Sequence, residues 1–288
     1  MTDTFPPSVP IWCAGCGHFS ILAALDSAFE RIGVPRHESL VLAGIGCSGT
    51  IQNHVTAYGY HALHGRVLPS AVGAKIANPA LTVIAAGGDG DGLAIGGGHL
   101  MHSFRTNPSV TYIMMNNGTY GLTKGQASPS SQAGYKGATD GRAADPIMLG
   151  LSMPGSTFLA RGYSGNAAQL AELTDAAINH SRAGKGFAFL DVISPCVAYN
   201  DRYHDWRSKL RDVSTIDGYD PHDRSAAFSL AVELEAEDMK LTGVIYEGEN
   251  LSLETTLGAT PSDGPADADI DPAANLPRVR ELMESFQG

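Results

Sequence analysis

The chain has 288 residues, of which 43% are hydrophobic and 17% charged, which is ordinary for a globular protein with one large core or two modest domains. Its net charge of −11 comes from the acidic end, because residues 214–288 carry 16 acidic and 4 basic side chains. The nearly neutral remainder argues against nucleic acid as a partner. No stretch approaches the roughly 18 consecutive apolar residues of a membrane helix, and the first residues lack the regions of a signal peptide. We therefore expect a cytoplasmic protein without a membrane or nucleic-acid partner.

Apolar runs and helix-like repeats alternate along the first two thirds of the chain. Strands are predicted at residues 39–46, 81–86, 110–115, 157–160 and 186–193. Helices are predicted at residues 19–32, 69–78, 93–106, 146–151 and 166–182. Residues 50–68 and 118–145 are predicted loops, and the second is long enough to be functional. Apolar runs without strict alternation, separated by helices, indicate an α/β fold with an open, mostly parallel sheet covered by helices on both faces.

The apolar pattern weakens after residue 200. A helix is predicted at residues 225–236, a strand or hairpin arm at 241–246, and a short amphipathic helix at 276–286. A flexible acidic linker is predicted at 259–275. We expect residues 1–213 to form one α/β domain and residues 214–288 to form an irregular acidic C-terminal extension, partly flexible around 259–275.

A glycine-rich turn and an asparagine pair follow two neighbouring predicted strands. Asp89 lies in the turn after the strand at 81–86, and Asn117 follows the strand at 110–115. A right-handed crossover puts both strand ends at one edge of the sheet, where ligands bind in open α/β folds. Carboxylate and amide oxygens, with the backbone carbonyl of Thr119, suit Mg²⁺, and the glycines let a diphosphate approach the backbone. An ordinary turn would explain Gly-Asp-Gly alone, but the paired spacing favours a site for Mg²⁺ and a diphosphate.

The four cysteines are Cys13, Cys16, Cys47 and Cys196, and a cytoplasmic chain rarely forms disulfides. The first two are spaced for a shared metal, and the other two each follow a predicted strand, so all four are expected near the edge that carries Asp89. Four thiolates in this setting suggest an iron–sulfur cluster. Three alternatives stay open: a zinc site, which more often has two Cys-x-x-Cys pairs, a thioredoxin-type redox pair, which needs a preceding strand, and buried structural cysteines.

The longer motifs resemble one protein family. GDGDGLAIGG at residues 88–97 and NNGTYGLTKGQ at residues 116–126 resemble the diphosphate motif of thiamine-diphosphate enzymes and, over their full length, the β subunit of 2-oxoacid:ferredoxin oxidoreductases. WCAGCGH at residues 12–18, GIGCSG at residues 44–49 and Cys196 after Ser-Pro resemble the segments that bind an iron–sulfur cluster in that family. The resemblance covers about residues 10–250 and says little about the remainder.

The resemblance implies a thiamine-diphosphate-binding fold whose domain, residues 1–213, holds thiamine diphosphate, Mg²⁺ and one 4Fe-4S cluster. It makes Asp89, Asn117 and Thr119 the Mg²⁺ ligands and the four cysteines the cluster ligands. The contacts it implies to thiamine diphosphate are Ile45, Gly46, Cys47, Ser48, His64, Gly90, Asp91, Gly121 and Leu122. The pairs Gly90-Asp91 and Gly121-Leu122 are expected to contact the diphosphate through the backbone. Without the resemblance, His64 would be interpreted as a solvated or structural loop histidine.

The implied reaction is the oxidative decarboxylation of a 2-oxo acid with coenzyme A, in either direction, with electrons passing through the cluster to ferredoxin. Lys124 stands in a Lys-Gly-Gln form that resembles the 2-oxoglutarate branch, and it is the candidate for binding a substrate carboxylate. A solvated surface lysine is the alternative, and no catalytic acid or base is assigned in this chain. Pyruvate or another 2-oxo acid is the alternative substrate. A non-redox thiamine decarboxylase subunit and an iron–sulfur electron carrier are the alternative functions.

A second domain of the size that binds the aminopyrimidine of thiamine is not expected in this chain, since residues 200–288 are too short and irregular. The resemblance implies that an α subunit supplies it, with most contacts to the substrate and to coenzyme A. We expect an α2β2 heterotetramer in which this chain alone is inactive.

Overall fold

The computed structural model describes residues 7–137, 142–259 and 272–286. Its strands are β1 (Ser39–Ala43), β2 (Tyr58–His61), β3 (Thr82–Gly88), β4 (Thr111–Asn116), β5 (Phe158–Tyr163), β6 (Ala188–Ile193), β7 (Leu210–Asp212) and β8 (Lys240–Glu247). Its α-helices are α1 (His18–Ile32), α2 (Val67–Ala77), α3 (Gly97–Thr106), α4 (Pro146–Ser152), α5 (Ala167–Arg182), α6 (Tyr203–Ser208), α7 (Arg224–Ala236), α8 (Leu253–Leu257) and α9 (Pro272–Ser285). Shorter helical turns are η1 (Arg36–Glu38), η2 (Ser48–Asn53), η3 (Gly90–Ile95), η4 (Tyr135–Gly137) and η5 (Val213–Thr215), of which η3 is a π-helix.

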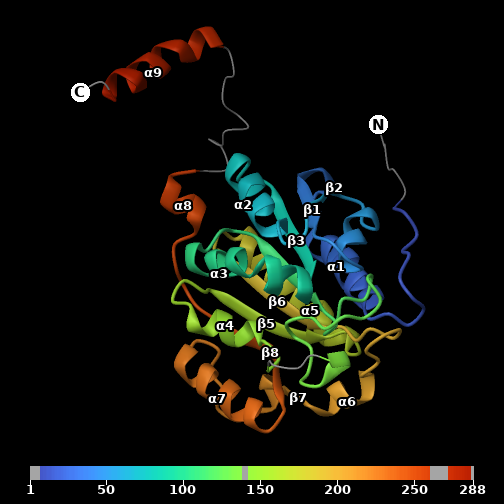
Figure 1. Ribbon diagram of the computed structural model, residues 1–288. Coiled ribbons are helices and arrows are strands. Elements are labelled where there is room, and N and C mark those ends of the chain that lie inside the picture. The colour runs from blue at the N-terminus through green and yellow to red at the C-terminus, as the bar shows by residue number, and fades with distance from the viewer. Residues whose placement is uncertain (1–6, 138–141, 260–271, 287–288) are drawn as a thin grey trace.

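The strands of the described residues form one eight-stranded sheet in the order β2-β1-β3-β4-β6-β5-β8-β7 (Figure 1). The first six strands in this order, from β2 through β1, β3, β4 and β6 to β5, are all parallel, so their carboxyl ends lie at one edge of the sheet. Strand β8 is antiparallel to β5, and β7 is parallel to β8. The mostly parallel α/β sheet predicted from the sequence is therefore confirmed.

Two hydrophobic layers enclose the sheet. Helices α1 and α5 pack on one face, and α2, α3, α4 and α7 pack on the other (Figure 1). Every residue of β4 and β6 is buried, because both faces of these central strands are covered. The burial explains why their sequences are continuous apolar runs. It also makes any charged residue within them conspicuous.

Most predicted strands and helices of the first 200 residues are confirmed with shifts of a few residues at their ends. The prediction of a loop at residues 50–68 is wrong, since this segment contains η2 and the edge strand β2. All four residues of β2 are exposed, so the strand carries no apolar pattern, and backbone pairing with β1 alone defines it. The helix predicted at residues 93–106 is divided, with the π-helical turn η3 preceding α3.

The acidic end of the chain contributes ordered elements to the body. The helix predicted at 225–236, the strand at 241–246 and the amphipathic helix at 276–286 are confirmed as α7, β8 and α9. Strand β8 extends the sheet past β5. The predicted linker at 259–275 falls largely on residues 260–271, which lie outside the described residues, and the domain boundary at residue 213 stays a prediction. Within the described part of the chain, no helix is long and apolar enough to cross a membrane.

His180 on α5 is a buried histidine beside the start of β5, at the edge of the sheet opposite the carboxyl ends of the parallel strands. Its Nε2 lies 3.1 Å from the hydroxyl of Thr157, and its ring packs 5.1 Å from that of Phe158. Burial lowers the pKa of His180 to about 4. An unfolded histidine titrates near 6.5, so below that pH the unfolded chain binds a proton that the folded chain excludes.

We therefore expect the free energy of unfolding to fall as the pH drops from about 6.5 to about 4, with His180 contributing roughly 3 kcal/mol of the loss. Replacing His180 with Phe removes this titration, so the loss should be smaller in the variant. Denaturant titrations at several pH values measure the difference. The exposed His37 provides the control, and a His180→Phe variant with the same pH dependence as wild type and His37→Phe would contradict the assignment.

Candidate functional site

The carboxyl ends of four adjacent parallel strands form the candidate site. In the sheet order, β1, β3, β4 and β6 are consecutive neighbours. Backbone hydrogen bonds continue past the strands, from Gly44 N–H to the Ala86 carbonyl at 2.9 Å and from Ser194 N–H to the Asn116 carbonyl at 2.7 Å. The turns that carry Cys47, Asp89, Asn117 and Cys196 therefore leave the same edge, as the sequence motifs predict.

Asp89 is the most deeply buried charged group at this edge. Its Oδ2 accepts hydrogen bonds from the hydroxyls of Ser128 and Ser130, and its Oδ1 accepts a long bond of 3.4 Å from the Asn117 N–H. Burial raises the pKa of Asp89 from its ordinary value, and the serine hydroxyls oppose that effect. Among the residues that the structure describes, no lysine, arginine or histidine forms an ion pair with it. A buried carboxylate with only neutral donors is a suitable place for a metal cation.

Asn117 and Thr119 lie in the turn beside Asp89. Both are buried, and the Asn117 Oδ1 accepts the Thr119 N–H at 3.1 Å. A carbonyl oxygen has two lone pairs, so this bond leaves one for a cation. The turn closes where the Tyr120 N–H donates to the Gln126 carbonyl at 2.9 Å. The structure thus brings the three predicted Mg²⁺ ligands to one turn and one strand end.

Asp91 organises the loops around the predicted cofactor contacts. Its Oδ1 accepts the N–H groups of Ile45 at 3.0 Å and Gly65 at 2.9 Å, and lies 2.8 Å from the Nδ1 of His64. The side chain of Asp91 is fully buried. The Asp91 carboxylate therefore holds two of the predicted contacts, Ile45 and His64, and also fixes the backbone of Gly65.

Two glycines allow close approach at the same edge. A Cβ on Gly90 would lie 2.2 Å from the ring of Tyr120, whose hydroxyl donates to the Gly90 carbonyl at 3.3 Å. Gly46 has a φ of 103°, which favours glycine over any residue with a side chain. Ser48 next to it is buried at the start of η2. The glycine positions of the motif are thus required by the backbone and by neighbouring rings.

The four cysteines are free thiols that converge on this edge. A Cβ on Gly121 would lie 3.5 Å from the Sγ atoms of both Cys47 and Cys196, and 3.6 Å from the Nδ2 of Asn117. Burial raises the pKa of the Cys47 thiol to about 11, and the charges of Cys16, Cys196 and Cys13 add to this rise. Such mutual repulsion shows that the four sulfurs share one neighbourhood.

The cysteine segments are also tied to the Asn117 turn. The Trp12 indole N–H donates to the Cys47 carbonyl at 2.7 Å. Asn200, whose N–H donates to the Cys196 carbonyl at 2.8 Å, donates through its amide to the Asn117 carbonyl at 3.0 Å. Across residues 7–137, 142–259 and 272–286, no three His, Cys, Asp or Glu side chains surround a single metal ion. A 4Fe-4S cluster sets a different requirement, because each thiolate binds a different iron.

Lys124 and Leu122 lie on the exposed side of the same turn. The backbone of Lys124 has a φ of 79°, an unusual conformation for a residue with a side chain, and its N–H donates to the Gly121 carbonyl at 3.1 Å. Its ammonium group is exposed. The structure therefore presents this lysine at the mouth of the site rather than inside it.

Sequence reasoning missed a buried ion cluster behind the metal ligands. Arg161 on β5 donates to Asp191 on β6 at 2.7 Å and to Asp145 at 2.6 Å, and Lys240 on β8 donates to Asp145 at 3.0 Å. Burial alone would raise the pKa of Asp145, but Arg161 and Lys240 outweigh it and hold that pKa well below its ordinary range. The signal was available, since Arg161 and Asp191 are lone charges inside apolar strand sequences.

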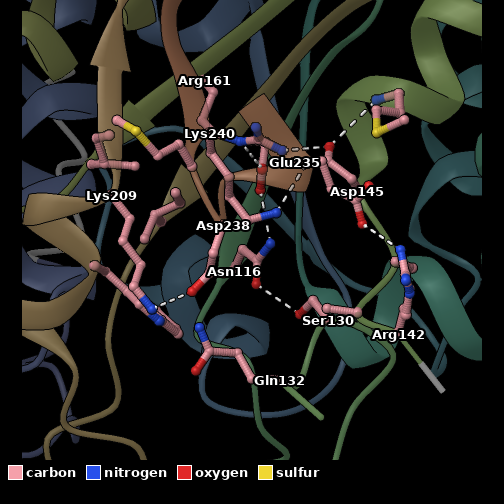
Figure 2. A pocket seen from close by; sticks show the side chains of 18 of the residues that line it. Asn116, Ser130, Gln132, Arg142, Asp145, Arg161, Lys209, Glu235, Asp238 and Lys240 are labelled. Atoms are coloured by element: carbon pink, nitrogen blue, oxygen red, sulfur yellow. Dashed lines mark hydrogen bonds and ion pairs between the residues drawn. The ribbon is translucent and has the colours of Figure 1, made fainter. Parts of the chain in front are cut away.

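The ion cluster lines a cavity of about 620 Å³ (Figure 2). Figure 2 shows Arg161 and Asp145 on one side of the cavity, with Asn116 hydrogen-bonded to Ser130 nearby. The Asn116 amide donates to Asp191 at 3.1 Å, and its Oδ1 lies 2.9 Å from the Ser130 hydroxyl. Ser128 and Ser130 are thus further polar residues of the site that the motifs did not reveal, and Asn116, which begins a motif, gains a structural role beside them.

The fold and the strand-end site define a thiamine-diphosphate-binding domain. Residues 44–192 match the family model described as "Thiamine pyrophosphate enzyme, C-terminal TPP binding domain". The match covers the glycine turn, the asparagine pair and three residues of the ion cluster, Asp145, Arg161 and Asp191.

The chain belongs to the family of β subunits of 2-oxoacid:ferredoxin oxidoreductases. It is 41% identical over 257 residues to the β subunit from Saccharolobus solfataricus, covering 84% of this chain and 83% of that protein. It is 38% identical over 204 residues to the 2-oxoglutarate synthase subunit KorB of Methanothermobacter marburgensis, covering 69% and 70%. A solved structure of 2-oxoglutarate:ferredoxin oxidoreductase from Magnetococcus marinus matches with a TM-score of 0.79 and 32% identity, covering 90% of each chain. That structure was solved with 2-oxoglutarate, coenzyme A and succinyl-CoA bound.

Proposed function

We propose that the chain is the cofactor-binding subunit of an enzyme that oxidatively decarboxylates 2-oxoglutarate with coenzyme A and passes the electrons to ferredoxin. Similarity to KorB subunits and the bound ligands of the Magnetococcus marinus structure support 2-oxoglutarate and coenzyme A as substrates. The reaction forms succinyl-CoA and CO₂ and releases two electrons to one-electron acceptors. The reverse reductive carboxylation uses the same groups.

One observation carries the proposal: the turn that follows Asn117 borders two cysteine sulfurs at Gly121. A metal–diphosphate site and a redox cluster would therefore share a single turn. We assign Asp89, Asn117 and the carbonyl of Thr119 to Mg²⁺, and the four cysteines to one 4Fe-4S cluster. When bound, thiamine diphosphate supplies the electron sink for decarboxylation, and the cluster supplies the route for single electrons.

The residues of this chain position those groups. Asp91 holds the loops of Ile45 and His64, which are expected to face the thiamine, through hydrogen bonds of 3.0 and 2.8 Å. Tyr120 packs its ring against Gly90 and donates its hydroxyl to the Gly90 carbonyl, which fixes the glycine turn. The N–H of Gly121 is used within its own turn, by the Thr119 carbonyl at 3.1 Å, so the turn is rigid before any ligand binds. The expected role of this chain is preorganisation rather than acid–base chemistry.

Anaerobic assays of the co-purified complex test the function. We expect reduction of methyl viologen that depends on both 2-oxoglutarate and coenzyme A, with iron, sulfide and thiamine diphosphate present. Cys16→Ser should lose iron and viologen reduction while keeping thiamine diphosphate, because only the cluster ligand is changed.

The same preparation separates the alternatives. Full activity without iron would favour a non-redox decarboxylase subunit, and iron without thiamine diphosphate would favour an electron carrier. Faster turnover of pyruvate than of 2-oxoglutarate would favour the alternative substrate. Any of these results would contradict the proposal.

An apolar rim around the site supports an α subunit as the partner. Its members are Ile45, Leu63, Ile95 and Leu122, whose exposed fractions are 38%, 77%, 54% and 57%. Ile45 and Leu63 flank the Asp91 hydrogen bonds, Ile95 packs beside Gly65, and Leu122 follows Gly121. Grouped apolar side chains on a surface indicate a protein interface. We propose that the α subunit covers this rim, completes the thiamine site and assembles with this chain as α2β2.

Replacing Leu63 and Ile95 with Asp should weaken the association with the α subunit at least tenfold, because each charge would be buried in the interface. Co-purification and analytical ultracentrifugation measure the loss. Leu251→Asp provides a control of similar exposure, 67%, away from the site. Normal assembly of the double variant, or equal weakening by Leu251→Asp, would contradict the interface.

Lys124 is proposed to bind the distal carboxylate of 2-oxoglutarate, since its ammonium is exposed at the mouth of the site. Lys124→Ala should lower kcat/KM for 2-oxoglutarate by about 10- to 100-fold, as expected for one charge-assisted hydrogen bond, and should leave pyruvate turnover nearly unchanged. Steady-state kinetics with both substrates measures the split. Lys185→Ala is the control on a distant surface, and an unchanged preference in Lys124→Ala would remove the assignment.

A further inference from the structure

Two serine hydroxyls converge on one oxygen of the buried Asp89 carboxylate. Ser128 and Ser130 both donate to Oδ2, while among the residues that the structure describes Oδ1 has only the long contact of 3.4 Å with the Asn117 N–H. Two donors on the same oxygen fix the rotation of a carboxylate, because turning it breaks both bonds. The less occupied oxygen then points toward Asn117, where a cation would find its next ligand.

The turn that carries the two serines is itself rigid. The Ser128 N–H donates to the Ser131 hydroxyl at 2.8 Å, and that hydroxyl donates to the Gly118 carbonyl at 2.7 Å. The Pro129 carbonyl accepts the Ala144 N–H at 2.8 Å, immediately before Asp145 in the ion cluster. Residues 128–131 are therefore fixed on one side to the Asn117 turn and on the other to Arg161 through Asp145.

Asn116 gives the Ser130 hydroxyl a second acceptor. Its amide nitrogen donates to Asp191, which orients Oδ1 toward Ser130 at 2.9 Å (Figure 2). A hydroxyl has one proton, and the charged Asp89 is the stronger acceptor while it lacks a cation. A carboxylate that binds a cation through Oδ1 keeps lone pairs on Oδ2, so Ser130 can go on donating to Oδ2. The nearby Asn116 Oδ1 helps to hold the Ser130 side chain beside Asp89.

We propose that Ser128 and Ser130 are positioning residues that clamp Oδ2 of Asp89 and present Oδ1, beside Asn117, to the divalent cation that binds the cofactor diphosphate. The inference rests on the proposed metal site and assigns a role to residues outside the motif. It also predicts the direction in which cation affinity changes when a serine is removed. Hydroxyl donors lower the negative charge on Asp89, so their removal would tighten cation binding if they had no positioning role, whereas loss of a positioning residue weakens it.

The test uses the co-purified complex, stripped of divalent metal and saturated with thiamine diphosphate, with Mn²⁺ as the probe. Electron paramagnetic resonance of free Mn²⁺ gives the dissociation constant. We expect Ser128→Ala and Ser130→Ala each to raise it about 10- to 100-fold, the range typical of groups that orient metal ligands. Ser128→Thr and Ser130→Thr keep the hydroxyls and should bind within about threefold of wild type. Thr123→Ala removes an exposed hydroxyl of the same loop and should have no effect.

Mn²⁺ affinity that is unchanged or tighter in both Ala variants would overturn the clamp, as would Thr variants that bind as weakly as the Ala variants. If one Ala variant does not fold, the other and the two Thr variants carry the same test. Asp89→Asn separates the inference from the metal assignment. Wild-type affinity in Asp89→Asn would overturn the metal site itself, whereas weak binding there with tight binding in the Ala variants would overturn only the clamp.

Discussion

A carboxylate buried at the carboxyl edge of a parallel sheet is the constraint on which the rest of the site depends. Asp89 is completely enclosed, and its described partners are hydroxyls and a backbone N–H, which are neutral. Placing a charge in this position costs free energy unless a cation joins it. The loop that carries Ser128 and Ser130 offsets part of that cost by donating two hydrogen bonds to Asp89.

Parallel topology gives this edge its second function. Because β1, β3, β4 and β6 are neighbours in the sheet, the segments that follow them lie close together. Gly121 is the point where they meet, bordered by Asn117 and by the sulfurs of Cys47 and Cys196. Burial raises the pKa of the Cys47 thiol, and repulsion from the neighbouring cysteines adds to the rise. Iron would relieve that repulsion, so the same geometry that crowds the cysteines makes them good cluster ligands.

The sequence predicts the parts of this architecture that depend on local pattern. Buried runs such as β4 and β6 identify the central strands, and the spacing from Asp89 to Asn117 identifies the edge at which they end. Pattern fails where backbone pairing alone decides the structure, as in the fully exposed edge strand β2.

Sequence pattern also fails to predict hydrogen bonds and ion pairs between residues that are distant in the chain. Ser130 reaches Asp89 across 41 residues, and Arg161 reaches Asp191 across 30. The sequence of a serine-rich loop does not indicate which groups will accept hydrogen bonds from its hydroxyls, because the sheet brings those groups near only in the folded chain. A single charged residue inside an apolar strand does predict a buried partner of opposite charge, although the sequence does not identify that partner.

The buried ion cluster explains how the acidic end of the chain is joined to the site. Arg161 on β5 has a carboxylate on each side, which leaves one negative charge in excess, and Lys240 at the start of β8 balances it. Strand β8 also covers the edge of β5, which would otherwise expose unpaired backbone groups. Asp145 then caps α4 and fixes the end of the loop that carries Ser128 and Ser130. The ion cluster joins β5, β6 and β8 and fixes the end of the loop whose serines donate to Asp89. The loop sequence does not reveal this connection.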